Sequence, residues 1–139
     1  MRRTLLAAAM AMTAMAATLL ATPGAAQAAS APYTMHTNDT DPGGRVRFWP
    51  NGDVVEVCDI EADGWAVQID IWNYTEGNTK VYSYQIGGNG NCQTLRASLG
   101  GKYDLEENDT FKFKICLDNA AHDPSYCDYN YWTNDNGLG

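Results

Sequence analysis

The chain of 139 residues has the length of one domain, and its formal net charge is −8. Such an acidic surface excludes nucleic acid and anionic membranes as tightly bound partners, because affinity for both comes from cationic contacts. Only the N-terminal segment is apolar enough to contact a membrane, so no membrane partner is expected once that segment is removed.

The first 28 residues have the order of a secretory signal peptide. Arg2 and Arg3 precede an apolar run over residues 4–20, and the small residues Ala26 and Ala28 provide a cleavage site. A membrane anchor is the alternative, but the run is dominated by Ala and lacks a basic stop signal after it. Cleavage after Ala28 leaves 111 residues with a net charge of −10, because two arginines are lost. We therefore expect a secreted protein.

Polar, turn-forming residues mark both ends of the mature chain. Residues 29–44 are predicted to be a flexible leader, and residues 133–139 a polar tail. Between them, over residues 45–132, apolar residues recur at period two and predict short strands at 45–49, 54–58, 65–72, 80–86, 93–98, 110–117 and 127–132. No segment has an amphipathic pattern of helix length. About seven short strands predict a single antiparallel β-sandwich, with a small barrel as the alternative.

Four cysteines remain after export, namely Cys58, Cys92, Cys116 and Cys127. An even number in an exported chain of this size predicts two disulfides, and the absence of any Cys-x-x-Cys spacing argues against zinc. Alternation places Cys116 on the side of Lys112 and Lys114, away from the core, and Cys58 on the side of Glu56. A core bridge of the immunoglobulin type is thereby excluded. We prefer the pairs Cys58–Cys92 and Cys116–Cys127.

The segment 59–70 has the acid spacing of a calcium loop. Asp59, Glu61 and Asp63 stand at positions 1, 3 and 5, Gly64 stands at position 6, and Asp70 stands at position 12. The flanking segments are predicted strands rather than helices, and position 12 is not Glu. An Asp/Gly turn between two strands is therefore favoured, and the three acids are only a weak calcium candidate.

Catalysis is not expected from this chain. The three residues His122, Asp123 and Ser125 contain the side-chain types of a hydrolytic triad, but their adjacency favours a loop. The acids lie mostly in turn-like segments, where solvated charge is their ordinary role, and a domain this small rarely forms a deep cleft. We predict no catalytic residue and no cofactor.

Aromatic residues occupy strand positions where polar residues are expected. Trp49 alternates with Arg45 and Arg47, and Trp72 alternates with Gln68 and Asp70. The last strand adds Tyr129, Tyr131 and Trp132. Single rings of this kind often cap the ends of a sandwich, but an outer patch of them marks a binding surface. The candidate ligand-binding residues are therefore Trp49, Trp72, Tyr129, Tyr131 and Trp132.

The Ala-rich N-terminus, the stretch Cys58-Asp-Ile-Glu-Ala-Asp-Gly-Trp65 and the stretch Phe111-Lys-Phe-Lys-Ile-Cys-Leu117, followed by a hairpin and Cys127, resemble small secreted β-sandwich proteins of actinobacteria. The resemblance extends over most of residues 44–132 and implies a secreted β fold and no activity. The chain is also similar in size, β architecture and disulfide number to streptomycete α-amylase inhibitors. Their Trp-Arg-Tyr triplet and their cysteine spacing are absent here, so no inhibitory residue carries over.

These observations predict a secreted, non-catalytic binding module. An extracellular protein is the expected partner, because Tyr, Trp and Arg anchor protein interfaces. Inhibition of an extracellular enzyme is one form that this binding could take. A neutral glycan is the alternative ligand, since planar rings with adjacent Asp, Asn and Gln suit sugars. A small extracellular enzyme is the less favoured third reading. The sequence does not indicate an oligomeric state.

Overall fold

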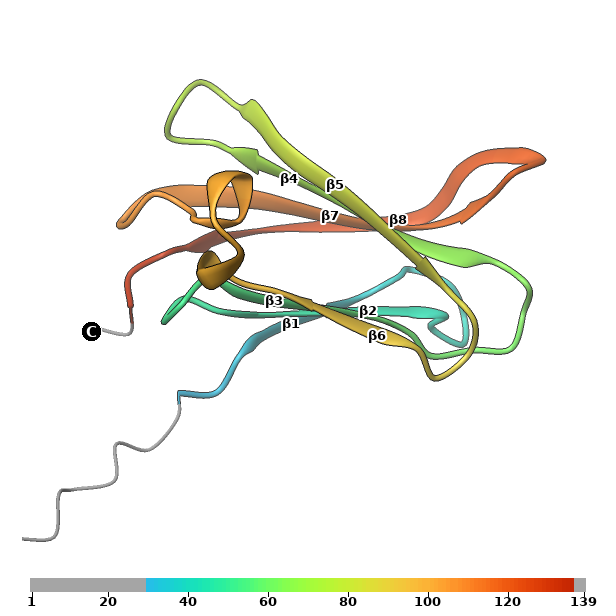
Figure 1. Ribbon diagram of the computed structural model, residues 1–139. Coiled ribbons are helices and arrows are strands. Elements are labelled where there is room, and N and C mark those ends of the chain that lie inside the picture. The colour runs from blue at the N-terminus through green and yellow to red at the C-terminus, as the bar shows by residue number, and fades with distance from the viewer. Residues whose placement is uncertain (1–29, 137–139) are drawn as a thin grey trace, which may run out of the picture.

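The computed structural model describes residues 30–136, and the predicted signal peptide lies outside them. Two antiparallel sheets of four strands each pack face to face (Figure 1). The first sheet has the order β1-β2-β3-β6, and the second sheet has the order β5-β4-β7-β8. The strands are β1 (Tyr33–His36), β2 (Gly44–Trp49), β3 (Val54–Asp59), β4 (Ala66–Asn73), β5 (Thr79–Gly87), β6 (Cys92–Leu95), β7 (Thr110–Asn119) and β8 (His122–Thr133). The prediction of an all-β sandwich is confirmed.

Two short 3-10 helices, η1 (Ala97–Leu99) and η2 (Gly101–Tyr103), connect the first sheet to the second. They close one end of the sandwich, and the β7–β8 hairpin projects past the body of the sandwich at the other end (Figure 1). No helix in the span from residue 30 to residue 136 has the length and apolarity that a membrane crossing requires.

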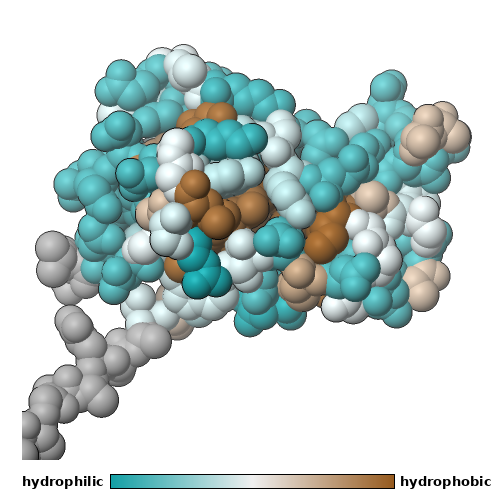
Figure 2. Space-filling model, in the orientation of Figure 1, coloured by the Kyte–Doolittle hydropathy of each residue, from teal (hydrophilic) through white to brown (hydrophobic). Residues whose placement is uncertain are grey.

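The core lies between the sheets and follows the predicted alternation. The first sheet contributes Val46, Phe48, Val55 and Val57, and the second contributes Val67, Ile69, Ile71, Phe111, Phe113, Ile115 and Leu117. Side chains at the intervening positions, such as Lys112 and Lys114, point outward and are half-buried. Figure 2 shows a largely hydrophilic surface in which hydrophobic residues gather along the middle, between the two sheets.

The predicted flexible leader over residues 29–44 is wrong in its central part. Residues 33–36 form β1, which pairs antiparallel with β2 and places Tyr33 opposite Phe48. Met35 is buried in the core, and the hydroxyl of buried Thr37 accepts a hydrogen bond from the Gly44 backbone N–H at 3.0 Å. The short strand escaped prediction because one buried apolar residue among polar neighbours has no detectable period.

The predicted polar tail also begins with ordered residues, because Thr133 ends β8 and Asn134 is fully buried. The Asn134 side-chain amide donates to Asp53 Oδ1 at 2.8 Å and to the Leu105 carbonyl at 3.1 Å. The other Asp53 oxygen accepts from the Leu105 N–H at 2.8 Å. Burial raises the pKa of Asp53 against the lowering effect of these hydrogen bonds. This network joins the β2–β3 turn, the segment before β7 and the C-terminal segment.

The disulfides are Cys58–Cys92 and Cys116–Cys127, as predicted. Cys58 lies directly opposite Cys92 in the β3–β6 register, and the second bridge joins β7 to β8. Both bridges lie on the outer faces of their sheets rather than across the core. They therefore fasten neighbouring strands within one sheet, where alternation places their side chains.

Candidate binding surface

An aromatic surface covers part of the outer face of the second sheet. It consists of Trp72, Tyr74, Tyr129 and Tyr131, together with the lysines in register with them, and is called the aromatic face below. In the strand register, Trp72 stands between Lys80 and Lys112, and Lys112 stands beside Tyr131. The next row places Asp70 beside Lys114 and Lys114 beside Tyr129. The sheet thus brings together side chains from four strands.

The three tyrosines of the aromatic face are exposed and contact one another. Tyr74, Tyr129 and Tyr131 are 54%, 59% and 43% exposed. The ring centroids of Tyr74 and Tyr131 are 4.9 Å apart, and those of Tyr129 and Tyr131 are 6.1 Å apart, both pairs edge to face. Edge-to-face contact is a preferred geometry for aromatic pairs, so the rings are held in place while their outer surfaces remain open to a partner.

Lysine ammonium groups connect Trp72 to the tyrosines. Lys80 Nζ and Lys112 Nζ lie 5.4 Å and 5.3 Å from the Trp72 ring centroid, and Lys112 Nζ lies 5.0 Å from that of Tyr129. These are cation–π distances. Sequence reasoning named Trp72, Tyr129 and Tyr131 but did not name Tyr74 or the lysines as members of this surface. Their signal was present, because Lys112 and Lys114 alternate with core residues and must therefore point outward.

Buried Asp70 fixes the base of the aromatic face. Its carboxylate accepts hydrogen bonds from Ser83 and from Gln68 (3.0 Å), and it forms an ion pair with Lys80 at 2.7 Å. Burial acts to raise the pKa of Asp70, but the hydrogen bonds from Lys80, Ser83 and Gln68 outweigh it and hold that pKa below its ordinary value. The carboxylate is therefore charged at neutral pH, and it positions Lys80 over Trp72.

Trp132 does not belong to this surface. Its side chain is 5% exposed, and its ring packs against Phe113 at 4.6 Å and against Tyr33 at 5.6 Å, between centroids. Strand β8 points Tyr129 and Tyr131 outward, so Trp132 faces the interior. The premise that this ring is exposed is contradicted, and we withdraw Trp132 as a ligand-binding candidate.

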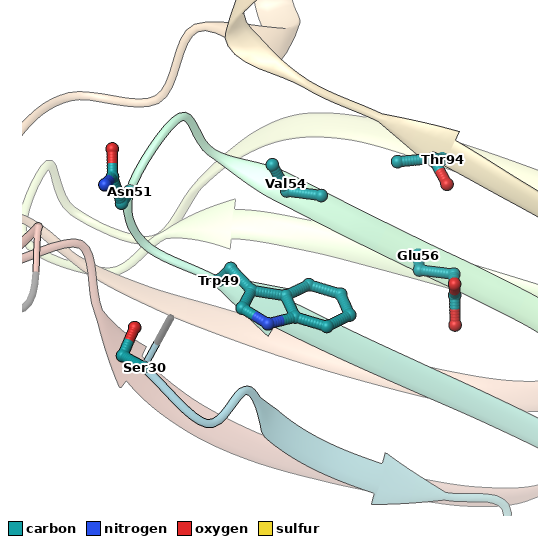
Figure 3. A pocket seen from close by; sticks show the side chains of 6 residues that line it. All are labelled: Ser30, Trp49, Asn51, Val54, Glu56 and Thr94. Atoms are coloured by element: carbon teal, nitrogen blue, oxygen red, sulfur yellow. The ribbon is translucent and has the colours of Figure 1, made fainter. Parts of the chain in front are cut away.

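Trp49 lies at the opposite side of the molecule, on the outer face of the first sheet. It stands in register with Val54, and the Arg47 guanidinium carbon lies 5.6 Å from its ring centroid. Together with residues of β3 and β6 it lines a hollow of about 310 Å³ (Figure 3). The five predicted residues therefore do not form one patch: Trp72, Tyr129 and Tyr131 come together, and Trp49 is separate.

The weak calcium candidates Asp59, Glu61 and Asp63 lie near the loop that connects β3 to β4. Burial and the carboxylates of Asp41 and Asp63 raise the pKa of Glu61. Among residues 30–136, three potential ligand atoms lie within 4.8 Å of one another only at Glu56, Cys58 and Cys92, and both sulfurs there belong to a disulfide. The carboxylate oxygens of Asp59, Glu61 and Asp63 therefore do not all lie within 4.8 Å of one another.

His122, Asp123 and Ser125 line a separate hollow with Trp65 and Tyr126. The Ser125 hydroxyl donates to the Asp123 backbone carbonyl at 3.0 Å, and His122 stacks on Trp65 with centroids 5.9 Å apart. In this part of the described chain, no hydrogen bond joins His122 to Ser125 or to Asp123. The arrangement lacks the contact that would transfer a proton from a serine nucleophile.

Comparison with known protein families, with curated proteins and with solved structures finds no match for this chain.

Proposed function

We propose that this protein is a secreted, non-catalytic binding module that docks an extracellular protein on its aromatic face. The observation that carries the proposal is the contiguous set of exposed tyrosines, Tyr74, Tyr129 and Tyr131, beside Trp72 on one sheet face. Tyr and Trp are enriched among the residues that dominate binding energy at protein interfaces. Support for secretion comes from the N-terminal basic, apolar and small-residue order and from the two disulfides.

The lysines favour a protein over a glycan at this face. A sugar ring that stacks on an indole needs an open ring face, but Lys80 and Lys112 both lie over Trp72. A protein partner instead contacts the tyrosine edges and the lysine stems together, because long lysine side chains cover apolar surface while their charge stays at the rim. The Cys116–Cys127 disulfide holds β7 to β8 next to Tyr129. Less conformational entropy is therefore lost when a partner binds this part of the surface.

Charge indicates the kind of protein that fits. The chain has four lysines, and three of them, Lys80, Lys112 and Lys114, lie in register with the rings, where Asp70 is the one acid. The aromatic face is thus a cationic area on an acidic protein. Complementary charge accelerates association and selects among partners, so the partner surface should be acidic.

The test is affinity measurement with variants of the aromatic face. Immobilised protein is expected to retain an acidic protein from the medium of its own host, and the Kd of that purified protein is then measured by calorimetry. Tyr129→Ala/Tyr131→Ala should raise the Kd by roughly thirtyfold or more, the loss of a central contact of about 2 kcal/mol. Lys112→Glu/Lys114→Glu should weaken binding most at low ionic strength.

Tyr126→Ala is the matched control, because Tyr126 lies on the same strand and is 55% exposed but contacts Trp65 instead of the aromatic face. It should leave the Kd unchanged. The proposal fails if no protein is retained, or if Tyr126→Ala weakens binding as much as the double tyrosine variant does.

A further inference from the structure

The hollow on the outer face of the first sheet has the construction of a small-ligand site. It is lined by Ser30, Trp49, Asn51, Val54, Glu56 and Thr94 (Figure 3). Its volume of about 310 Å³ is at the lower end of the range for small-molecule pockets. It lies on the other sheet from the aromatic face and shares no residue with it.

One wall of the hollow is apolar and planar. The Trp49 indole lies along β3 between Asn51 and Glu56 (Figure 3), and Val54 is its register partner. One cation, the Arg47 guanidinium with its carbon 5.6 Å from the ring centroid, contacts this indole and steadies it, whereas two ammonium groups lie over Trp72. The plane is therefore positioned before any ligand arrives, and it suits a ligand that has an apolar face.

The facing groups are polar, and one is held rigidly. Glu56 Oε1 accepts hydrogen bonds from Arg47 Nε at 2.9 Å and from Arg45 Nη2 at 3.5 Å. These two arginines fix the carboxylate, whereas Glu56 Oε2 has no hydrogen-bond partner among residues 30–136. Thr94 stands beside Glu56 in the β3–β6 register. A fixed carboxylate oxygen beside a hydroxyl suits a ligand that donates hydrogen bonds.

The side chains of Ser30, Asn51 and Thr94 make no hydrogen bond to any other residue that the structure describes. Each lines the hollow and can exchange a bound water for a ligand hydroxyl. A purely apolar ligand would bury these groups unsatisfied, which is costly. An anionic ligand would meet the Glu56 carboxylate, and a cationic ligand would gain little from that carboxylate, because it is already paired with Arg45 and Arg47.

We propose that this hollow binds one pyranose ring of a neutral oligosaccharide. The apolar C–H face of the sugar stacks on Trp49 and Val54. Its hydroxyls donate to Glu56 Oε2 and exchange hydrogen bonds with Thr94 and Asn51. The inference is independent of the proposed protein-binding function, because the two surfaces lie on opposite sheets.

The test is titration of the purified exported protein with neutral hexasaccharides of glucose, xylose, mannose and galactose, followed by calorimetry and tryptophan fluorescence. Saturable binding with a fluorescence change is expected for at least one neutral sugar. Trp49→Ala should weaken it by roughly tenfold or more, and Thr94→Val, which keeps the side-chain shape, should weaken it by roughly threefold or more. Tyr126→Ala is the control, because Tyr126 is an exposed aromatic residue of the second sheet that lines neither surface, and it should leave sugar binding unchanged.

The outcomes separate the two proposals. An oligogalacturonate is titrated in parallel as a charged sugar. Absence of binding across the neutral panel overturns this inference, as does binding that survives Trp49→Ala or binding to the oligogalacturonate alone. None of these results affects retention of a protein partner. Conversely, a protein that binds sugar normally but retains no partner contradicts the proposed function alone.

Discussion

Trp132→Ala is expected to lower the free energy of unfolding by about 3–5 kcal/mol, the usual cost of removing a large aromatic side chain from a core. Trp132 is 5% exposed, and its ring contacts Phe48, Phe113 and Tyr33. Those contacts connect β8 of the second sheet to β1 and β2 of the first. A cavity there removes packing that joins the sheets, and the surrounding rings relax only in part. Urea unfolding monitored by circular dichroism provides the measurement.

Tyr131→Ala is the control for this prediction. Its position is the preceding one on β8, but its side chain points outward and is 43% exposed. Its removal should change stability by no more than about 0.5 kcal/mol. Equal effects of the two variants would show that β8 does not alternate as described.

Removal of the Cys58–Cys92 bridge, by Cys58→Ala/Cys92→Ala, is expected to lower the free energy of unfolding by up to about 4 kcal/mol. The bridge closes a loop with a sequence separation of 34, whereas Cys116–Cys127 closes one of 11. Because the entropy of an unfolded chain falls more when a longer loop is closed, the shorter bridge should contribute about 3 kcal/mol. Domains of this size are stable by about 5–15 kcal/mol, so either loss matters.

The comparison of the two cysteine-pair variants by thermal and urea unfolding decides between loop entropy and local packing. Loop entropy predicts the larger loss for Cys58→Ala/Cys92→Ala. A larger loss of unfolding free energy for Cys116→Ala/Cys127→Ala would contradict loop entropy as the cause. It would mean that the β7–β8 hairpin needs its disulfide to keep its native contacts.

Alternation predicted much of the fold because both sheets have one buried face. The side chains of Phe111, Phe113 and Ile115 face inward, and Lys112 and Lys114 face outward. The same rule excluded a core disulfide, and the neighbouring pairs followed from it. In each of these strands, a one-residue slip would expose the whole apolar set, so the sequence pattern leaves little freedom.

The elements that escaped prediction lack that pattern. Strand β1 has one core residue, Met35, and depends on the edge of β2 for its hydrogen bonds. The consecutive rings of Tyr131 and Trp132 have no apolar period, so which of them is buried depends on the β7–β8 register. The polar side chain of Asn134 can be buried because its amide donates a hydrogen bond to Asp53, which is 81 residues away in sequence. Such pairings require the tertiary structure.

The sequence identified aromatic members of the candidate surface, but it did not show that Trp49 lies on a different sheet from the others. Trp72 could be assigned to an outer position from its neighbours in sequence, whereas the outer position of Tyr129 follows from the β7–β8 register. Whether Trp49 joins them depends on which sheet contains β2, and short strands do not encode sheet order. The molecule consequently has two distinct faces, one rich in tyrosine and lysine and one with a small hollow.

Tyrosine footprinting with and without the retained partner tests the central claim most directly. Exposed tyrosines are nitrated with tetranitromethane, and the modified positions are quantified by peptide mass spectrometry. The partner is predicted to protect Tyr74, Tyr129 and Tyr131, while Tyr126, which is 55% exposed and lies off the aromatic face, reacts as before. Unchanged nitration of Tyr129 and Tyr131 in the complex, or protection of Tyr126 instead, would contradict docking on the aromatic face.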